Sequence, residues 1–230
     1  TMEYKEGVPV LRDISFHIDK GEFVFLVGPS GAGKTTVLRL IYRDIKPTSG
    51  EIIVAGKNLS RMKDSQIPYL RRMIGVFFQD FKLLPHKTVF ENVALALKVS
   101  GVGRSEIRRK VNQILHLVGL SHCRDAYPEE ISGGEQQRAA IARAVANDPL
   151  ILLADEPTGN LDTQTGLEII YLLKQMNEER GVTVITATHD TKMLDVSDRI
   201  FHIQDGKIAK IETRAEIKLR VGMLDGQEVG

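Results

Sequence analysis

The chain has 230 residues, of which 42% are hydrophobic, and this length is enough for one sizeable core with a smaller helical subdomain. No apolar run approaches the roughly 20 residues of a membrane span, and no signal-peptide pattern opens the chain. The formal net charge of +1 gives no sign of a nucleic-acid-binding protein, and the single cysteine, which excludes an internal disulfide, fits the cytosol.

The N-terminal part of the chain predicts strands around a glycine-rich turn. After a short polar start at residues 1–7, Ile14, Phe16 and Ile18 alternate with polar residues, which indicates a half-buried strand. The apolar run 23–27 predicts a buried strand and the run 36–42 a helix. The turn between them consists of Gly28, Pro29, Ser30, Gly31, Ala32, Gly33, Lys34 and Thr35, followed by Thr36.

A strand, a glycine-rich turn and a helix N-terminus form the context of a phosphate-binding loop. The glycines let backbone N–H groups converge on one anion, which also meets the positive end of the helix dipole. We expect Lys34 to reach the β- and γ-phosphates of a nucleotide and the Thr35 hydroxyl to bind Mg²⁺. A chance match in a glycine-rich turn is the alternative, but the flanking strand and helix favour nucleotide binding.

The rest of the chain alternates strands and helices, which predicts an α/β fold: a P-loop NTPase core with a mostly parallel sheet and an antiparallel β edge. From about 80 to 148 the pattern is helical, so we expect a helical subdomain inserted into a core of about 1–79 and 149–213, before a tail at 214–230. Within the subdomain, Ser105 is expected to cap a helix that Gly119 ends. Further elements are predicted at 51–54, 67–73, 74–78, 150–154, 163–179, 182–186, 199–204 and 207–211, the last two joined by a hairpin turn at 205–206. An alanine-rich helix is predicted after residues 131–137, running to about 146.

Polar side chains stand where several predicted strands end, which is where ligands bind in open α/β sheets. Asp155 is a candidate Mg²⁺ partner through water, and Glu156 can polarise the attacking water as a general base. Gln79 ends another strand, and its neutral amide can contact both Mg²⁺ and the water. His189 could contact the γ-phosphate, although a lone histidine is more often structural.

A second small, glycine-rich turn opens a helix at Ser132, Gly133 and Gly134, with Glu135 directly after it. Such a turn is a second anion site. Because one chain offers no obvious second phosphate, the economical explanation is that this turn completes the nucleotide site of another copy. The sequence therefore predicts a head-to-tail homodimer that forms on ATP binding, with two ATP at the interface.

Taken together, these motifs resemble an ATP-binding-cassette ATPase, and the resemblance extends from Tyr4 to about Ile211. The residues that carry it are 28–35, 79, 131–137, 150–156, 159–162 and 189. The resemblance implies that Gln79 also senses a membrane partner. The family pattern has one more strand before Tyr4, so we expect a truncated N-terminus.

The same resemblance implies further roles at matching positions. Tyr4 would stack on adenine, and His189 would act as the switch histidine. Ser132 and Gly134 would bind the γ-phosphate held by the opposite subunit. Asp162 would lie at the dimer interface.

A narrower resemblance within the family is to ATPases of bacterial cell division, carried by residues 40–43, 67–72, 78–84 and 132–138, and above all by Asp80 after Gln79. It implies an integral membrane partner, contacted through residues 79–93 at the cytoplasmic face of the membrane, and control of peptidoglycan hydrolases outside it. Relatives that serve lipoprotein release or macrolide export share most of these residues and are the alternative. A DNA-associated tether is less favoured, because no sustained heptads separate Lys34 from Ser132, and no nucleic-acid partner is expected.

Overall fold

The computed structural model describes residues 1–78, 80–190 and 194–217, and its centre is a six-stranded sheet in the order β10-β9-β3-β8-β7-β6. These strands are β3 (Phe23–Val27), β6 (Ile74–Phe78), β7 (Ile151–Asp155), β8 (Thr183–Thr188), β9 (Arg199–Gln204) and β10 (Lys207–Thr213). All neighbouring pairs are parallel except β10 with β9, which is antiparallel. The predicted mostly parallel sheet with an antiparallel edge is confirmed.

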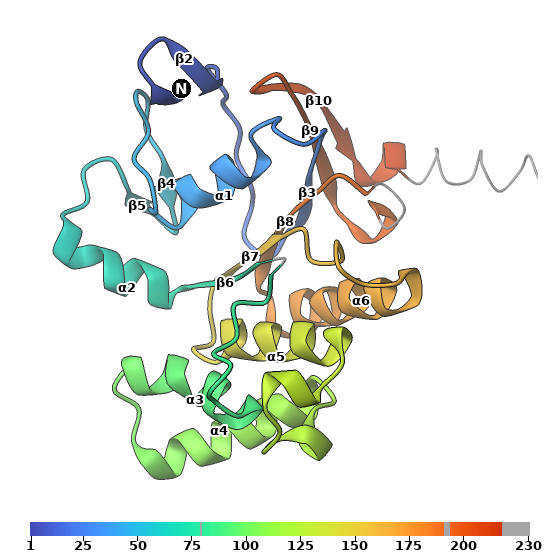
Figure 1. Ribbon diagram of the computed structural model, residues 1–230. Coiled ribbons are helices and arrows are strands. Elements are labelled where there is room, and N and C mark those ends of the chain that lie inside the picture. Colours follow the sequence, from blue (N-terminus) through green and yellow to red (C-terminus); the bar gives the residue numbers. More distant parts are fainter. Residues whose placement is uncertain (79, 191–193, 218–230) are drawn as a thin grey trace, which may run out of the picture.

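Helices cover both faces of this sheet (Figure 1). They are α1 (Lys34–Ile41), α2 (Ile67–Arg72), α3 (Val89–Val99), α4 (Arg104–Leu117), α5 (Gly133–Val145) and α6 (Thr163–Arg180). Because side chains of a strand alternate between faces, β3 contributes to two cores. Phe23, Phe25 and Val27 pack with α3 to α6, whereas Val24 and Leu26 pack with α1. The glycine-rich turn and α5 therefore belong to opposite faces of the sheet.

Two small antiparallel hairpins accompany the sheet: β1 (Met2–Lys5) with β2 (Val8–Leu11), and β4 (Ile53–Val54) with β5 (Lys57–Asn58). The sequence did not predict the first, and the strand expected at 51–54 is shorter than predicted. The predicted hairpin turn between β9 and β10 is confirmed. Asp205 and Gly206 there have φ of 49° and 72°, the left-handed conformations that a two-residue turn requires.

The strand predicted around Ile14, Phe16 and Ile18 is wrong, because residues 12–19 belong to no strand. The alternation of burial is nevertheless present: these three side chains are half-buried, and the Phe16 ring lies 5.2 Å from that of Phe201. Alternating polarity reports which side chains face a core. It does not report whether a neighbouring strand supplies ladder hydrogen bonds.

The helical segment contains one further correction. The N-cap of α4 is Gly103, not Ser105, which lies inside the first turn. At the other end Gly119 has φ of 72°, as expected of a helix-terminating glycine. Residues 214–217 are helical and Ile217 is buried, while the loose end predicted beyond them falls on 218–230, outside the described residues. Within the described ranges, no helix is both long and apolar enough to cross a membrane.

Candidate functional site

The predicted phosphate-binding turn lies between β3 and α1, at the carboxyl end of the sheet. Gly28 is packed so closely that a Cβ atom would collide with the carbonyl oxygen of Ile203. A Cβ at Gly33 would lie 2.5 Å from Leu11 Cδ2, and Gly31 and Gly33 have φ of +80° and +106°. Glycine alone meets these demands without strain, and Gly33 is the N-cap of α1. The three glycines therefore let the backbone of the turn pack closely and reach the N-terminus of α1.

Lys34 lies folded against this turn, with its side chain only 6% exposed. Its Nζ donates to the carbonyl oxygens of Gly28 at 2.8 Å and Pro29 at 3.1 Å, and lies 3.8 Å from Glu156 Oε1. A buried ammonium needs such partners because an unpaired one is costly. The same ammonium is placed to exchange carbonyl acceptors for a charged phosphate.

Thr35 and Asp155 meet beside the turn, although 120 residues separate them in the sequence. The Thr35 hydroxyl donates to Asp155 Oδ1 at 3.0 Å. Burial raises the pKa of the Asp155 carboxyl, and the neighbouring Glu156 adds to this, while the Thr35 hydroxyl and Lys34 oppose it. A hydroxyl and a carboxylate are the hard oxygen ligands that Mg²⁺ prefers, so these two residues fit the predicted metal.

Glu156 joins Lys34 to His189. Its Oε2 lies 3.0 Å from His189 Nδ1 and accepts the His189 backbone N–H at 3.3 Å. Its own backbone N–H donates to the Ala187 carbonyl at 2.8 Å, with φ of 49°. Non-glycine residues rarely adopt positive φ, and those that do often belong to functional sites. Lys34, Thr35, Asp155, Glu156 and His189 thus form one continuous cluster.

Tyr4, the predicted adenine partner, lies beside α1 with half of its surface exposed. Its hydroxyl is 3.4 Å from Thr36 Oγ1 and accepts from Arg39 Nη1 at 3.2 Å. The Arg39 guanidinium lies 5.8 Å from the centroid of the Tyr4 ring. Tyr4 is therefore tied to the helix that begins at the phosphate-binding turn.

The Ser132 turn does not join this cluster, because it caps α5 on the opposite face of the sheet. Ser132 and Glu135 form a capping box: the Ser132 N–H and hydroxyl both donate to Glu135 Oε2, at 2.8 and 2.7 Å. These bonds, with another from His122, hold the pKa of Glu135 at about 2. Gly133 is exposed, and a Cβ at Gly134 would lie 2.6 Å from Thr165 Cγ2.

Two predicted site residues remain. Asp162 is the N-cap of α6, and its Oδ1 accepts the Thr165 N–H at 3.0 Å. Hydrogen bonds from Thr165 lower the pKa of this carboxyl. Gln79 lies outside the described residues.

The sequence also missed residues that line a cavity of about 710 Å³ next to Thr35 and Asp155. Tyr42, the C-cap of α1, Phe78 of β6 and Lys82 contribute to its wall. Lys82 Nζ lies 4.0 Å from the centroid of the Phe78 ring, and Lys82 has φ of 48°. The only available signal was that Phe78 and Lys82 lie at or just after a predicted strand end. Tyr42 gave no signal, because it reaches this wall only through the fold, where its ring centroid lies 6.5 Å from that of Phe78.

Comparisons with known proteins show which family the chain resembles in sequence and structure. A family model described as "ABC transporter" matches residues 11–159. The cell division ATP-binding protein FtsE of Bacillus subtilis is 50% identical over 214 residues, covering 93% of this chain and 93% of that protein. FtsE of Mycobacterium tuberculosis is 48% identical over 216 residues, covering 93% and 94%. The dimeric structure of the ATP-binding cassette MJ0796 bound to ADP and Pi matches with a TM-score of 0.84 and 39% identity, covering 93% of this chain and 95% of that one.

Proposed function

Because this chain belongs to the ABC transporter family of ATPases, we propose that it binds ATP together with Mg²⁺ and hydrolyses it to ADP and phosphate. The continuous cluster of Lys34, Thr35, Asp155, Glu156 and His189 supports this proposal most directly. The backbone N–H groups of the turn at 28–35, all but that of Pro29, which has none, and the Lys34 ammonium hold the phosphates. A relative with a dimeric structure bound to ADP and Pi also supports hydrolysis.

Thr35 and Asp155 are the residues that would hold Mg²⁺, with Gln79 as a third candidate ligand. When bound, the metal neutralises the charge that develops on the phosphates. Glu156 accepts the proton of the attacking water as a general base, and the His189 imidazole orients the Glu156 carboxylate from its other oxygen. The positive φ of Glu156 sets the direction of this side chain.

The metal assignment can be tested with Asp155→Asn, which keeps the shape of the side chain but removes its charge. We expect phosphate release from ATP to fall at least about tenfold at limiting Mg²⁺, because a charged oxygen ligand is lost. The matched control is Asp125→Asn, at a carboxylate whose side chain is 83% exposed. Equal magnesium dependence in the two variants would refute the role of Asp155.

We further propose that the chain is the ATP-driven subunit of a bacterial cell-division complex at the cytoplasmic face of the membrane. Two relatives with nearly full mutual coverage carry the name FtsE, which supports this assignment. The resemblance implies an integral membrane partner similar to FtsX. Through this partner, ATP hydrolysis would control peptidoglycan hydrolases. Co-purification of the tagged chain with an FtsX-like protein from membranes would test this. Recovery with a lipoprotein-release or macrolide-export partner instead would favour the alternative.

The proposed contact region for this partner is residues 79–93. Val89 is fully buried and belongs to the core, whereas Phe81, Leu83 and Leu84 are half-buried. The buried Asn92 side chain donates to the Leu84 carbonyl at 3.2 Å and accepts the Leu84 N–H at 2.8 Å. We therefore propose that the membrane partner contacts the loop before Val89. The Asn92 side chain holds this loop in place through its hydrogen bonds to Leu84.

Crosslinking can locate this contact. In a Cys123→Ser background, Leu84→Cys should crosslink to the membrane partner. Glu6→Cys, on the exposed turn of the β1–β2 hairpin, is the matched control and should not. Crosslinks from position 6 but not from position 84 would refute the assigned region.

A homodimer is the last part of the proposal. Within one chain the Ser132 turn and the phosphate-binding turn belong to opposite faces of the sheet. This separation supports a site in which each Ser132 turn completes the nucleotide site of a second copy. The related cassette MJ0796 is likewise dimeric.

A further inference from the structure

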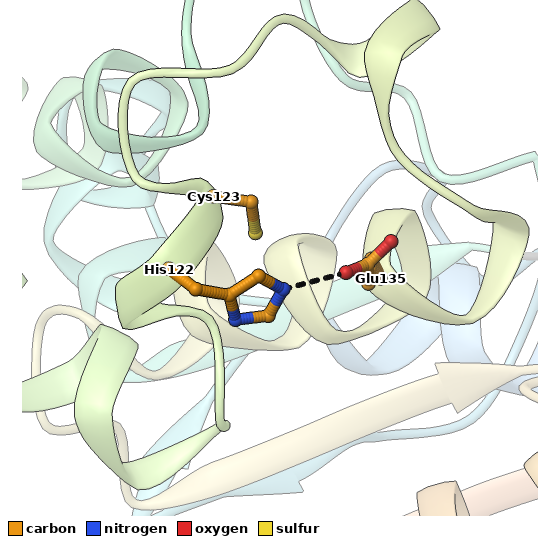
Figure 2. Close-up of side chains that lie close together, drawn as sticks. All are labelled: His122, Cys123 and Glu135. Atoms are coloured by element: carbon orange, nitrogen blue, oxygen red, sulfur yellow. Dashed lines mark hydrogen bonds and ion pairs between the residues drawn. The ribbon is translucent and has the colours of Figure 1, made fainter.

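Three potential metal ligands that do not belong to the Lys34 cluster converge beside the start of α5. His122 and Cys123 belong to the 3₁₀ turn η2 (Ser121–Cys123), and Glu135 lies in the first turn of α5. Their ligand atoms all lie within 4.8 Å of one another, and His122 Nε2 is 2.9 Å from Glu135 Oε1. Figure 2 shows the imidazole and the carboxylate facing each other, with the Cys123 sulfur directed toward them.

We propose that His122, Cys123 and Glu135 bind a zinc ion. A nitrogen, a thiolate sulfur and a carboxylate oxygen are the three ligand types that proteins offer to Zn²⁺, whereas Mg²⁺ and Ca²⁺ avoid sulfur. In a tetrahedral site with bond lengths of about 2.1 Å, neighbouring N and O ligands are about 3.4 Å apart. The hydrogen-bonded pair of His122 and Glu135 needs to open by only a few tenths of an ångström. Water takes the fourth position.

The surroundings of the cluster suit such a site. The His122 side chain is 65% exposed, which leaves an entry path, while Cys123 is buried and Glu135 is 20% exposed. The Cys123 thiol has only a long contact, 3.6 Å, to the Leu120 carbonyl, so little is lost when its sulfur turns to a metal. Binding forms a zinc–sulfur bond and releases the thiol proton to solvent.

The Glu135 carboxylate connects this site to Ser132. While Oε1 of Glu135 faces His122, Oε2 accepts both hydrogen bonds from Ser132. A metal on Oε1 would therefore fix the carboxylate that orients the Ser132 hydroxyl. This connection to ATP turnover rests on the proposed function of Ser132, but the metal site itself does not.

Cobalt substitution tests the site directly, because Co²⁺ replaces Zn²⁺ and absorbs light when a thiolate binds it. The sequence contains a single cysteine, so a thiolate-to-cobalt band in the full chain can arise only from Cys123. We expect this band to saturate at one equivalent of Co²⁺ without nucleotide, and one equivalent of Zn²⁺ to abolish it. Absence of the band at saturating Co²⁺ would overturn the proposal.

Substitutions complete the test. Cys123→Ser should lack the band, and His122→Gln should weaken Co²⁺ binding by more than the roughly 10–100-fold that loss of a supporting contact costs. His116→Gln, an exposed histidine of α4, is the matched control and should bind like the native chain. Because His122 is exposed, its replacement leaves the fold intact, and unchanged affinity in His122→Gln would refute the three-ligand site.

The connection to Ser132 is measured separately. Zinc should change the ATP turnover of the native chain at fixed Mg²⁺ but not that of His122→Gln, which retains the whole ATP site. Equal responses of the two chains would overturn this connection, while the nucleotide-free titration decides the metal site independently.

Discussion

At the scale of single residues, Lys34 shows how a side chain can be held ready for a ligand. Its ammonium is almost fully buried, yet its hydrogen-bond acceptors are two carbonyl oxygens, and the Glu156 carboxylate lies 3.8 Å away as an ion-pair partner. Carbonyl oxygens are weaker partners for an ammonium than phosphate oxygens, because hydrogen bonds between two charged groups are the stronger ones. The exchange of partners therefore favours the bound state without a large movement of the lysine.

We predict that Lys34→Ala abolishes tight ATP binding. The variant loses a charge-assisted contact worth about 1.5–3 kcal/mol and leaves the Glu156 carboxylate without its cation, so affinity should fall about 10–100-fold or more. Calorimetric titration with ATP measures this. Lys98→Ala, at an exposed lysine of α3, should bind normally. Unchanged affinity in Lys34→Ala would contradict the assignment of the phosphate-binding loop.

The ring and the hydroxyl of Tyr4 can be tested separately by substitution. We predict that Tyr4→Ala weakens ATP binding modestly, since base–aromatic stacking is worth roughly 1–3 kcal/mol. Tyr4→Phe is the control: it removes the hydrogen bonds of the hydroxyl to Thr36 and Arg39 but keeps the ring, and should bind ATP nearly as well. Inorganic triphosphate should bind the native chain, Tyr4→Ala and Tyr4→Phe with equal affinity. If triphosphate lost as much affinity as ATP in Tyr4→Ala, the stacking role would be wrong.

At the scale of elements, the caps of two neighbouring helices give opposite expectations. Thr88 caps α3 through a capping box with Glu91, whereas Ser105 makes no cap of α4. We predict that Thr88→Ala lowers the free energy of unfolding by about 1 kcal/mol and that Ser105→Ala changes it little. Urea denaturation measures both. A larger loss in Ser105→Ala than in Thr88→Ala would contradict the observed start of α4.

The elements differ in how far their sequence determines them. Strands buried on both faces, such as β3 and β7, are continuous apolar runs and were predicted from them. The β1–β2 hairpin was missed because only its ends, Met2 and Leu11, are buried. Ile14 to Ile18 was wrongly predicted as a strand because its half-buried alternation arises without a ladder.

The residues of the candidate site also differ in how far the sequence predicts their meeting. Parallel strands carry their carboxyl ends to one edge, so the meeting of Asp155, Glu156 and the phosphate-binding turn could be predicted. The places of Arg39 and Lys82 could not be predicted, because Arg39 lies within α1 and Lys82 in the loop after β6, and only the fold brings both to one cavity. The pairing of His122 with Glu135 depends on the turn between α4 and α5, which no periodic pattern describes.

At the scale of the whole molecule, the sheet separates the phosphate-binding turn from the Ser132 turn, which are the two halves of the proposed nucleotide site. The phosphate-binding turn packs with α1 on one face, and the Ser132 turn opens α5 on the other. In the proposed dimer two chains in head-to-tail arrangement complete two sites at once. Association should then depend on ATP, because the nucleotide supplies the phosphate that both halves contact.

We predict that Glu156→Gln traps this dimer. The amide keeps the shape of the side chain but cannot accept a proton, so hydrolysis should fall about 10²–10⁴-fold. Lys34, Thr35 and the loop amides are unchanged, so ATP still binds, and Ser132 of the opposite copy still reaches its γ-phosphate. Light scattering with ATP and Mg²⁺ should therefore report a dimer, and a monomer without nucleotide.

Two comparisons make this result specific. Glu129→Gln, at an exposed carboxylate of the turn before Ser132, should hydrolyse ATP and should not accumulate a dimer. Adding Ser132→Arg to Glu156→Gln should leave ATP binding intact but prevent dimerisation, because the bulky side chain fills the second anion site. If Glu156→Gln binds ATP and stays monomeric, isolated chains do not associate in this way. The energy of association would then have to come from the membrane partner, which would hold the two copies together before ATP arrives.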